Sequence, residues 1–78
     1  LNTSVAHPRE IFRSALLNNG ARILVYHNHP SGNTEPSEAD LIFTKRMEEA
    51  GSILGIDLLD HIIVSGKEWL SLREYGIL

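Results

Sequence analysis

The sequence predicts an α/β fold built around a small mixed sheet. Two segments with helical spacing of apolar residues, 8–19 and 38–54, alternate with two strand-like runs, 22–26 and 57–64. If the two runs are parallel neighbours, the second helix is the crossover between them. A glycine turn then leads into a short strand at 68–70, which pairs back as a hairpin and makes the sheet mixed.

Local signals justify the elements of the first half. Pro8 starts the first helix, His7 before it is expected in a loop or at the N-cap, and Gly20 supplies the left-handed cap that ends it. The run 22–26 is almost uninterruptedly apolar, which is typical of a strand covered on both faces, so we expect it at the centre of the sheet with Tyr26 in the core. The proline- and glycine-rich segment 27–36 is expected to be an ordered loop.

The second half shows the same kind of pattern. Helix 38–54 follows Ser37, ends at Gly55 and carries one apolar stripe, formed by Ala39, Ile42, Phe43, Met47, Ala50 and Leu54. In strand 57–64 the expected faces are Leu58, Ile62 and Val64 on one side and Leu59 and Ile63 on the other. Trp69 is expected in the core, and Ser71–Glu74 resembles a capping box that opens a final turn.

Composition limits the functional classes. The length of 78 residues suits a single domain, 1–78, and 42% hydrophobic with 22% charged residues is an ordinary globular balance. The net charge of −3 does not support nucleic-acid binding. No segment is long and apolar enough to span a membrane, so we expect a soluble, cytoplasmic protein with no membrane partner. The absence of cysteine excludes disulfides and thiolate metal sites, and the start at Leu1 suggests part of a longer chain.

The stretch from His27 to Asp40 predicts a metal site at the carboxyl end of a strand. Side chains one residue apart in extended backbone share a side, so His27 and His29 can bind one cation while Asn28 points away. Asp40, at the start of the next helix, adds a carboxylate. Such ligands suit catalytic Zn²⁺, which lowers the pKa of a bound water to about 7 and favours amide hydrolysis. Ser37 can donate a hydrogen bond to the developing oxyanion.

Plainer interpretations stay open. Ser37 to Asp40 can be only a helix cap, and an isolated H-x-H pair is weak evidence. Metallo-β-lactamase-like sites place an Asp-His pair where Ser31 and Gly32 stand, and barrel amidohydrolases need a far longer chain. His61 follows Asp60 on a strand, so the two point to opposite faces, and we expect His61 to be a packed or hydrogen-bonded structural residue.

The pattern H-x-H-P, six residues, then S-x-x-D resembles the JAMM signature of the MPN+ (JAB/MPN) metalloproteases. The wider match to the bacterial RadC-like branch covers essentially the whole chain and includes Pro8-Arg9-Glu10, His27–Gly32, Pro36-Ser37 and Leu59–Ile63. The resemblance implies a cytidine-deaminase-like α/β sandwich. It also implies His27, His29 and Asp40 as zinc ligands and Ser37 as the residue on the oxyanion side.

The family's general base is a glutamate on a strand upstream of the signature. The resemblance therefore implies that residues 1–78 are the C-terminal portion of the domain, and neither Glu10 nor Glu35 is expected to replace that base. We expect a zinc-dependent hydrolase of peptide or isopeptide bonds, acting on a peptide or protein and inactive without the upstream glutamate. The alternative is a non-catalytic interaction module of a RadC-like, DNA-repair-associated protein. An exposed sheet edge would favour a homo-oligomer.

Overall fold

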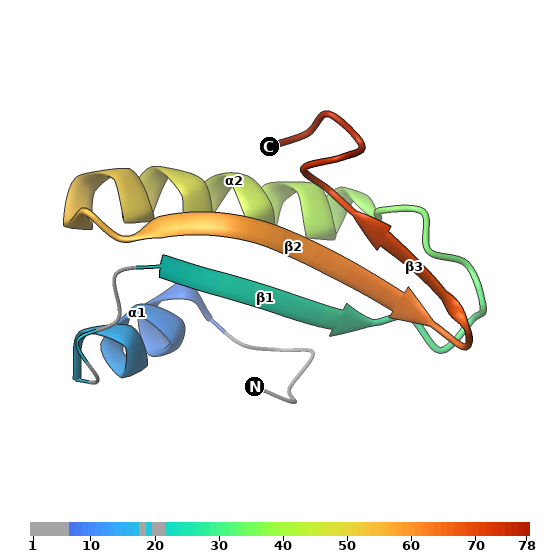
Figure 1. Ribbon diagram of the computed structural model, residues 1–78, viewed down its shortest axis with the longest axis horizontal. Coiled ribbons are helices and arrows are strands. Elements are labelled where there is room, and N and C mark those ends of the chain that lie inside the picture. The colour runs from blue at the N-terminus through green and yellow to red at the C-terminus, as the bar shows by residue number, and fades with distance from the viewer. Residues whose placement is uncertain (1–6, 18, 20–21) are drawn as a thin grey trace.

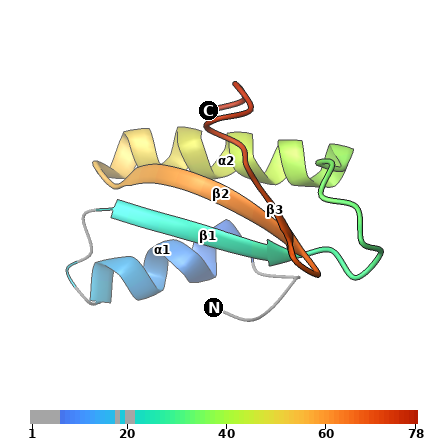
Figure 2. The ribbon, with the colours of Figure 1, turned by 45° about the vertical axis from the view of Figure 1, so that its right-hand side comes forward.

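The computed structural model describes residues 7–17, 19 and 22–78 and confirms the α/β class. Its elements in chain order are α1 (Pro8–Leu17), β1 (Arg22–Asn28), α2 (Glu38–Leu54), β2 (Asp57–Ser65) and β3 (Glu68–Ser71). The described strands form one mixed sheet in the order β1-β2-β3, with β1 and β2 parallel and β2 and β3 antiparallel (Figures 1 and 2). The two parallel strands are joined by α2, as the sequence predicted.

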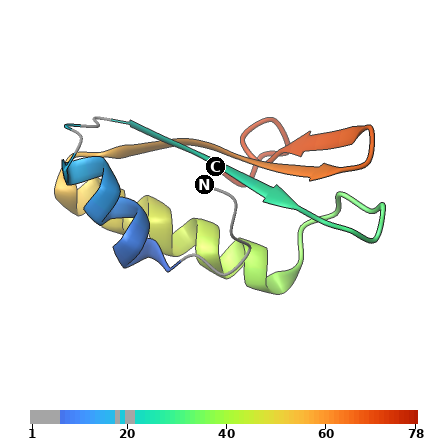
Figure 3. The same ribbon diagram turned by 90° about the horizontal axis from the view of Figure 1, so that it is seen from below.

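Both helices pack on the same face of the sheet (Figure 3). A core of buried apolar side chains fills the space between them and the strands, formed by Ile11, Phe12, Ile23, Met47, Ile56 and Leu58. The C-terminal part of α2 lies very close to the backbone that leads into β2. A Cβ added at Gly51 would lie 2.2 Å from the carbonyl oxygen of Ile56, so only glycine fits at this position. No helix in the described part of the chain is long and apolar enough to cross a membrane.

The first helix begins at the predicted residue and ends two residues before the predicted one. His7 caps it, because its Nδ1 accepts a hydrogen bond from the backbone N–H of Arg9 at 3.0 Å. The helix ends at Leu17, and Asn19 lies in a turn with a left-handed φ of 55°. The predicted cap at Gly20 falls outside the described residues.

The prediction that strand 22–26 is central in the sheet was wrong. The strand extends to Asn28 and lies at the edge of the described sheet, while β2 is central. One of its faces is open, since Leu24 and Tyr26 are 46% and 59% exposed. The expected core position of Trp69 was also wrong, because that side chain is 60% exposed. Pairing of two chains along the free edge of β1 stays a prediction.

The bounds of α2 agree with the prediction, but its buried face differs. The N-cap is Ser37, and Gly55 ends the helix with a left-handed φ of 72°. The fully buried positions are Asp40, Thr44, Met47 and Gly51. Three members of the predicted stripe, Ala39, Ile42 and Leu54, are exposed instead. The face of α2 that packs on the sheet thus consists mostly of polar or small residues. Asp40 and Thr44 contribute polar groups to the site, and Gly51 permits the close approach to Ile56.

A β-bulge changes which residues of β2 face the helices. Ile23 pairs with Leu58 but Leu24 pairs with Asp60, so Leu59 is an extra residue on β2. Leu58 is buried before the bulge, and after it the buried positions are His61, Ile63 and Ser65, so the alternation shifts by one residue. The prediction that placed Leu58 on the face of Ile62 was wrong for this reason.

The C-terminal segment closes the free edge of β2 beyond β3. Asp60 accepts hydrogen bonds from the Ser71 hydroxyl and from the backbone N–H of Arg73, the latter at 3.0 Å. The Arg73 guanidinium donates to the carbonyl oxygens of Leu58 and Leu59. The predicted turn after Ser71 is confirmed, since the Ser71 hydroxyl accepts from the Glu74 N–H at 3.1 Å.

Candidate metal centre

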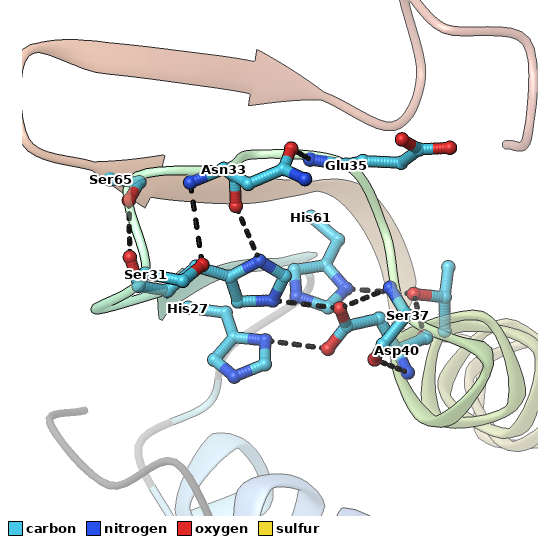
Figure 4. A network of polar contacts seen from close by, with 10 residues as sticks. His27, Ser31, Asn33, Glu35, Ser37, Asp40, His61 and Ser65 are labelled. Carbon is cyan, nitrogen blue, oxygen red and sulfur yellow. Dashed lines mark hydrogen bonds and ion pairs between the residues drawn. The ribbon is translucent and has the colours of Figure 1, made fainter.

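Three side chains converge where β1 ends and α2 begins. His27 is on β1, His29 follows its last residue, and Asp40 is in the first turn of α2. One donor atom from each lies within 4.8 Å of the others. His27 Nδ1 is 2.7 Å from Asp40 Oδ1 and His29 Nε2 is 2.9 Å from Asp40 Oδ2 (Figure 4). The structure thus brings together the three predicted ligands, and Asn28 is exposed.

This donor set fits a zinc ion. Zinc binds nitrogen and oxygen at about 2.0–2.2 Å, so donors around a tetrahedral ion lie about 3–4 Å apart. The three donors here need only small side-chain movements to reach that spacing. The carboxylate already bridges the two imidazoles, and a cation between these groups would take the place of a shared proton.

The loop after β1 fixes the ring of His29. Its Nδ1 lies 3.0 Å from the carbonyl oxygen of Asn33, which can only accept, so Nδ1 carries the proton and donates. The backbone of His29 is held on β2, because its N–H donates to the Val64 carbonyl at 2.8 Å and its carbonyl accepts from the Ser65 hydroxyl. A carbonyl partner on the far nitrogen is typical of histidines that bind metal through the other nitrogen.

Asp40 has a second role in the helix cap. Its backbone N–H donates to the Ser37 hydroxyl at 3.0 Å, while its Oδ2 accepts from the Ser37 N–H at 2.8 Å. This is a complete capping box. Burial alone would raise the pKa of Asp40, but the main chain and side chain of Ser37 and the two imidazoles outweigh it and hold the pKa below its usual value of 3.8. The carboxylate is therefore ionised at neutral pH.

The capping interpretation and the metal interpretation of Ser37 to Asp40 are compatible in this geometry. Oδ2 receives the Ser37 N–H and contacts His29, whereas Oδ1 contacts only His27 among the hydrogen bonds and ion pairs of the described residues. The cap thus orients the carboxylate without using all of its lone pairs. Ser37 itself lines a cleft of about 650 Å³ beside His27 and Asp40, which leaves room for a ligand next to the three donors.

A second polar pair lies directly behind the centre. Thr44 and His61 are both 1% exposed, and Thr44 Oγ1 lies 2.7 Å from His61 Nδ1. The prediction that His61 is a hydrogen-bonded structural residue agrees with this contact. Burial holds the pKa of His61 below its usual value of 6.5, against the opposing effect of the Asp40 carboxylate. Thr44 was missed by the sequence analysis, although it stands one helical turn after Asp40.

Glu10 and Glu35, the two glutamates that could be compared with the family's general base, lie away from His27, His29 and Asp40. The Glu10 carboxylate is on the exposed side of α1, 4.0 Å from the Arg9 guanidinium. Glu35 is exposed, and its carboxylate points away from His27 and Asp40 (Figure 4). Within the described residues, neither glutamate is placed to act as a general base at this centre.

Comparison with known proteins places this geometry in a family. The model of the RadC-like JAB domain matches residues 1–77. A UPF0758 protein of Enterococcus faecalis is 62% identical over 74 residues, covering 95% of this chain and 32% of that protein. One from Listeria monocytogenes is 55% identical over 76 residues, with 97% and 34% covered, and one from Clostridium beijerinckii is 51% identical over 78 residues, with 100% and 34% covered.

The chain spans about a third of the length of these curated relatives. The match nevertheless runs through every described element, from α1 to the turn after β3, and includes His27, His29, Ser37 and Asp40. The chain therefore belongs to the RadC-like JAB domain family.

Proposed function

We propose that this chain carries the metal centre of a zinc-dependent hydrolase of peptide or isopeptide bonds. The observation that carries the proposal is the convergence of two imidazoles and one ionised carboxylate beside an open cleft. The fixed Nδ1–H of His29 adds support, since it leaves Nε2 as the nitrogen directed at the ion.

In this proposal His27, His29 and Asp40 hold the ion. When bound, zinc would act as a Lewis acid and would lower the pKa of a coordinated water to about 7. Ser37 lines the same cleft, so its hydroxyl is available to a substrate oxygen that gains charge. The proton-transfer base is proposed to come from outside the described residues, on a strand upstream of the signature, because neither Glu10 nor Glu35 lies at the centre.

Metal analysis tests the first half of the proposal. Protein prepared without chelator should hold close to one zinc per chain, and the double variant His27→Ala/His29→Ala should lose it. His7→Ala is a matched control, because His7 is exposed and its ring contacts the start of α1 rather than this centre. Wild-type protein without zinc, or a double variant that keeps it, would contradict the proposal.

Activity requires a longer chain that includes the upstream segment. Such a protein should cleave amide bonds in a metal-dependent way, and Asp40→Asn should abolish cleavage, because the amide is a neutral and weaker ligand. Replacing an upstream strand glutamate by glutamine should abolish cleavage while zinc stays bound. Persistent inactivity against a broad library of peptides and isopeptide-linked proteins would count against the proposal.

A non-catalytic interaction module is the second candidate. The absence of a base near the centre within the described residues favours it, as does the exposed face of β1 with Leu24 and Tyr26. The longer protein distinguishes the two candidates. An interaction module should bind its partner equally well with the upstream glutamate and with its glutamine replacement, and neither protein should cleave amide bonds.

A further inference from the structure

We propose that Thr44 and His61 form a positioning pair for the metal centre, which holds Asp40 through its backbone and His27 through ring stacking. Neither residue is among the three converging donors, and both are almost completely buried. The inference rests on the proposed function, because it concerns how the ligands of that same site are kept in place.

The hydrogen bonds determine the direction of each proton. The Thr44 hydroxyl donates its single hydrogen to the Asp40 carbonyl oxygen at 2.8 Å. Its oxygen must then accept from His61, so the proton of the neutral imidazole is on Nδ1, at 2.7 Å. This chain of two bonds ties β2 to the helical turn that carries the Asp40 carboxylate.

The imidazole of His61 also supports a ligand directly. Its ring stacks on that of His27, with centroids 5.8 Å apart and an angle of 25° between the planes. Phe43 contacts the same ring edge-on at 5.8 Å, so the His61 ring is held by another aromatic side chain as well. Figure 4 shows the His61 ring in the same cluster of side chains as His27, Ser37 and Asp40.

The remaining nitrogen of His61 argues against a role in packing alone. Its Nε2 is buried and has no hydrogen-bond partner among the described residues. An unpaired buried acceptor costs free energy, and an apolar side chain of similar size would fill the space without that cost. Two contacts account for a histidine at this position: its Nδ1–H donates to the Thr44 hydroxyl, and its ring stacks on that of His27.

Nitrogen NMR of the full-length protein tests the tautomer without any need for metal or activity. Long-range ¹H–¹⁵N spectra should show His61 with a protonated Nδ1 and an unprotonated Nε2. In Thr44→Val, which keeps the shape but removes the hydroxyl, the Nδ1 proton should exchange faster with water. A proton on Nε2 of His61 in the wild-type protein would overturn the inference.

Zinc affinity, measured by competition with a chromophoric chelator, tests the effect on the site. Thr44→Val and His61→Phe should each weaken zinc binding about 10- to 100-fold, as expected for residues that orient metal ligands. Thr44→Ser keeps the hydroxyl and should restore affinity to within a few-fold of wild type. Cobalt substitution should show an altered visible spectrum in Thr44→Val, which a loss of stability alone would not produce.

The outcomes separate this inference from the proposed function. A wild-type protein that binds no zinc would overturn both. A wild-type protein that binds zinc, with folded Thr44→Val and His61→Phe that bind it equally tightly, would overturn the inference alone. If Thr44→Val does not fold, the comparison of Thr44→Ser with His61→Phe decides, because the inference requires that only the second loses affinity.

Discussion

Zinc should stabilise the fold, and Asp40→Asn should remove that stabilisation. A ligand at 100 times its dissociation constant adds about 2.7 kcal/mol to the unfolding free energy. A domain of this size shifts its melting temperature by about 4–8 °C per kcal/mol. Zinc should therefore raise the melting temperature of the wild-type protein by roughly 11–22 °C, measured by circular dichroism with zinc and with EDTA.

Two further variants separate the two roles of Asp40. Ser37→Ala removes the hydroxyl that caps α2, at a cost of about 1 kcal/mol, but keeps the Ser37 N–H that orients Oδ2. It should melt about 4–8 °C lower while retaining the zinc-induced shift. Asp57→Asn makes the same chemical change as Asp40→Asn at an exposed position of β2 and should behave like wild type. Equal zinc shifts in Asp40→Asn and wild type would refute the reasoning.

Three other predictions concern the fold around the site. Gly51→Ala should destabilise the protein by about 1–3 kcal/mol in urea unfolding, although alanine is the better helix former, because its Cβ would meet the Ile56 carbonyl; a gain in stability would contradict the close approach. The pKa of Asp60 is lowered, since hydrogen bonds from Ser71, Arg73 and the His61 N–H outweigh the effect of burial that would raise it. Its stabilising contribution is therefore present above the unfolded value near 3.9 and is lost as the pH falls through the lower folded value, so Asp60→Asn should flatten the acid limb of stability against pH. Arg73→Ala should cost about 1 kcal/mol and speed hydrogen exchange at the start of β2, and unchanged exchange there would argue against its role at that edge.

The elements with strong local signals could be predicted from the sequence. The bounds of α2 follow from the cap at Ser37 and the left-handed glycine at Gly55, both of which act within a few residues. The convergence of His27, His29 and Asp40 also follows from local spacing, because a strand end and the next helix start are joined by a short ordered loop.

The predictions that failed depend on contacts between distant parts of the chain. Apolar periodicity does not distinguish an edge strand from a central one, so Tyr26 was expected in the core although it is 59% exposed. It also cannot identify a buried face made of polar residues. The buried carboxylate of Asp40 contacts His27 and His29, and the buried hydroxyl of Thr44 contacts His61, and only the folded arrangement provides those partners.

The extra residue in β2 sets the chemistry behind the metal centre. With regular alternation after Leu58, the side chain turned toward α2 would be that of Asp60. A second carboxylate would then stand near Asp40, where like charges repel and raise the pKa of one of them. Because the bulge accommodates Leu59 as an extra residue, the neutral imidazole of His61 faces α2 in place of that acid. Deleting Leu59 should therefore leave the His61 side chain turned toward α2, because regular alternation in the shortened strand again places Leu58 and His61 on the same face.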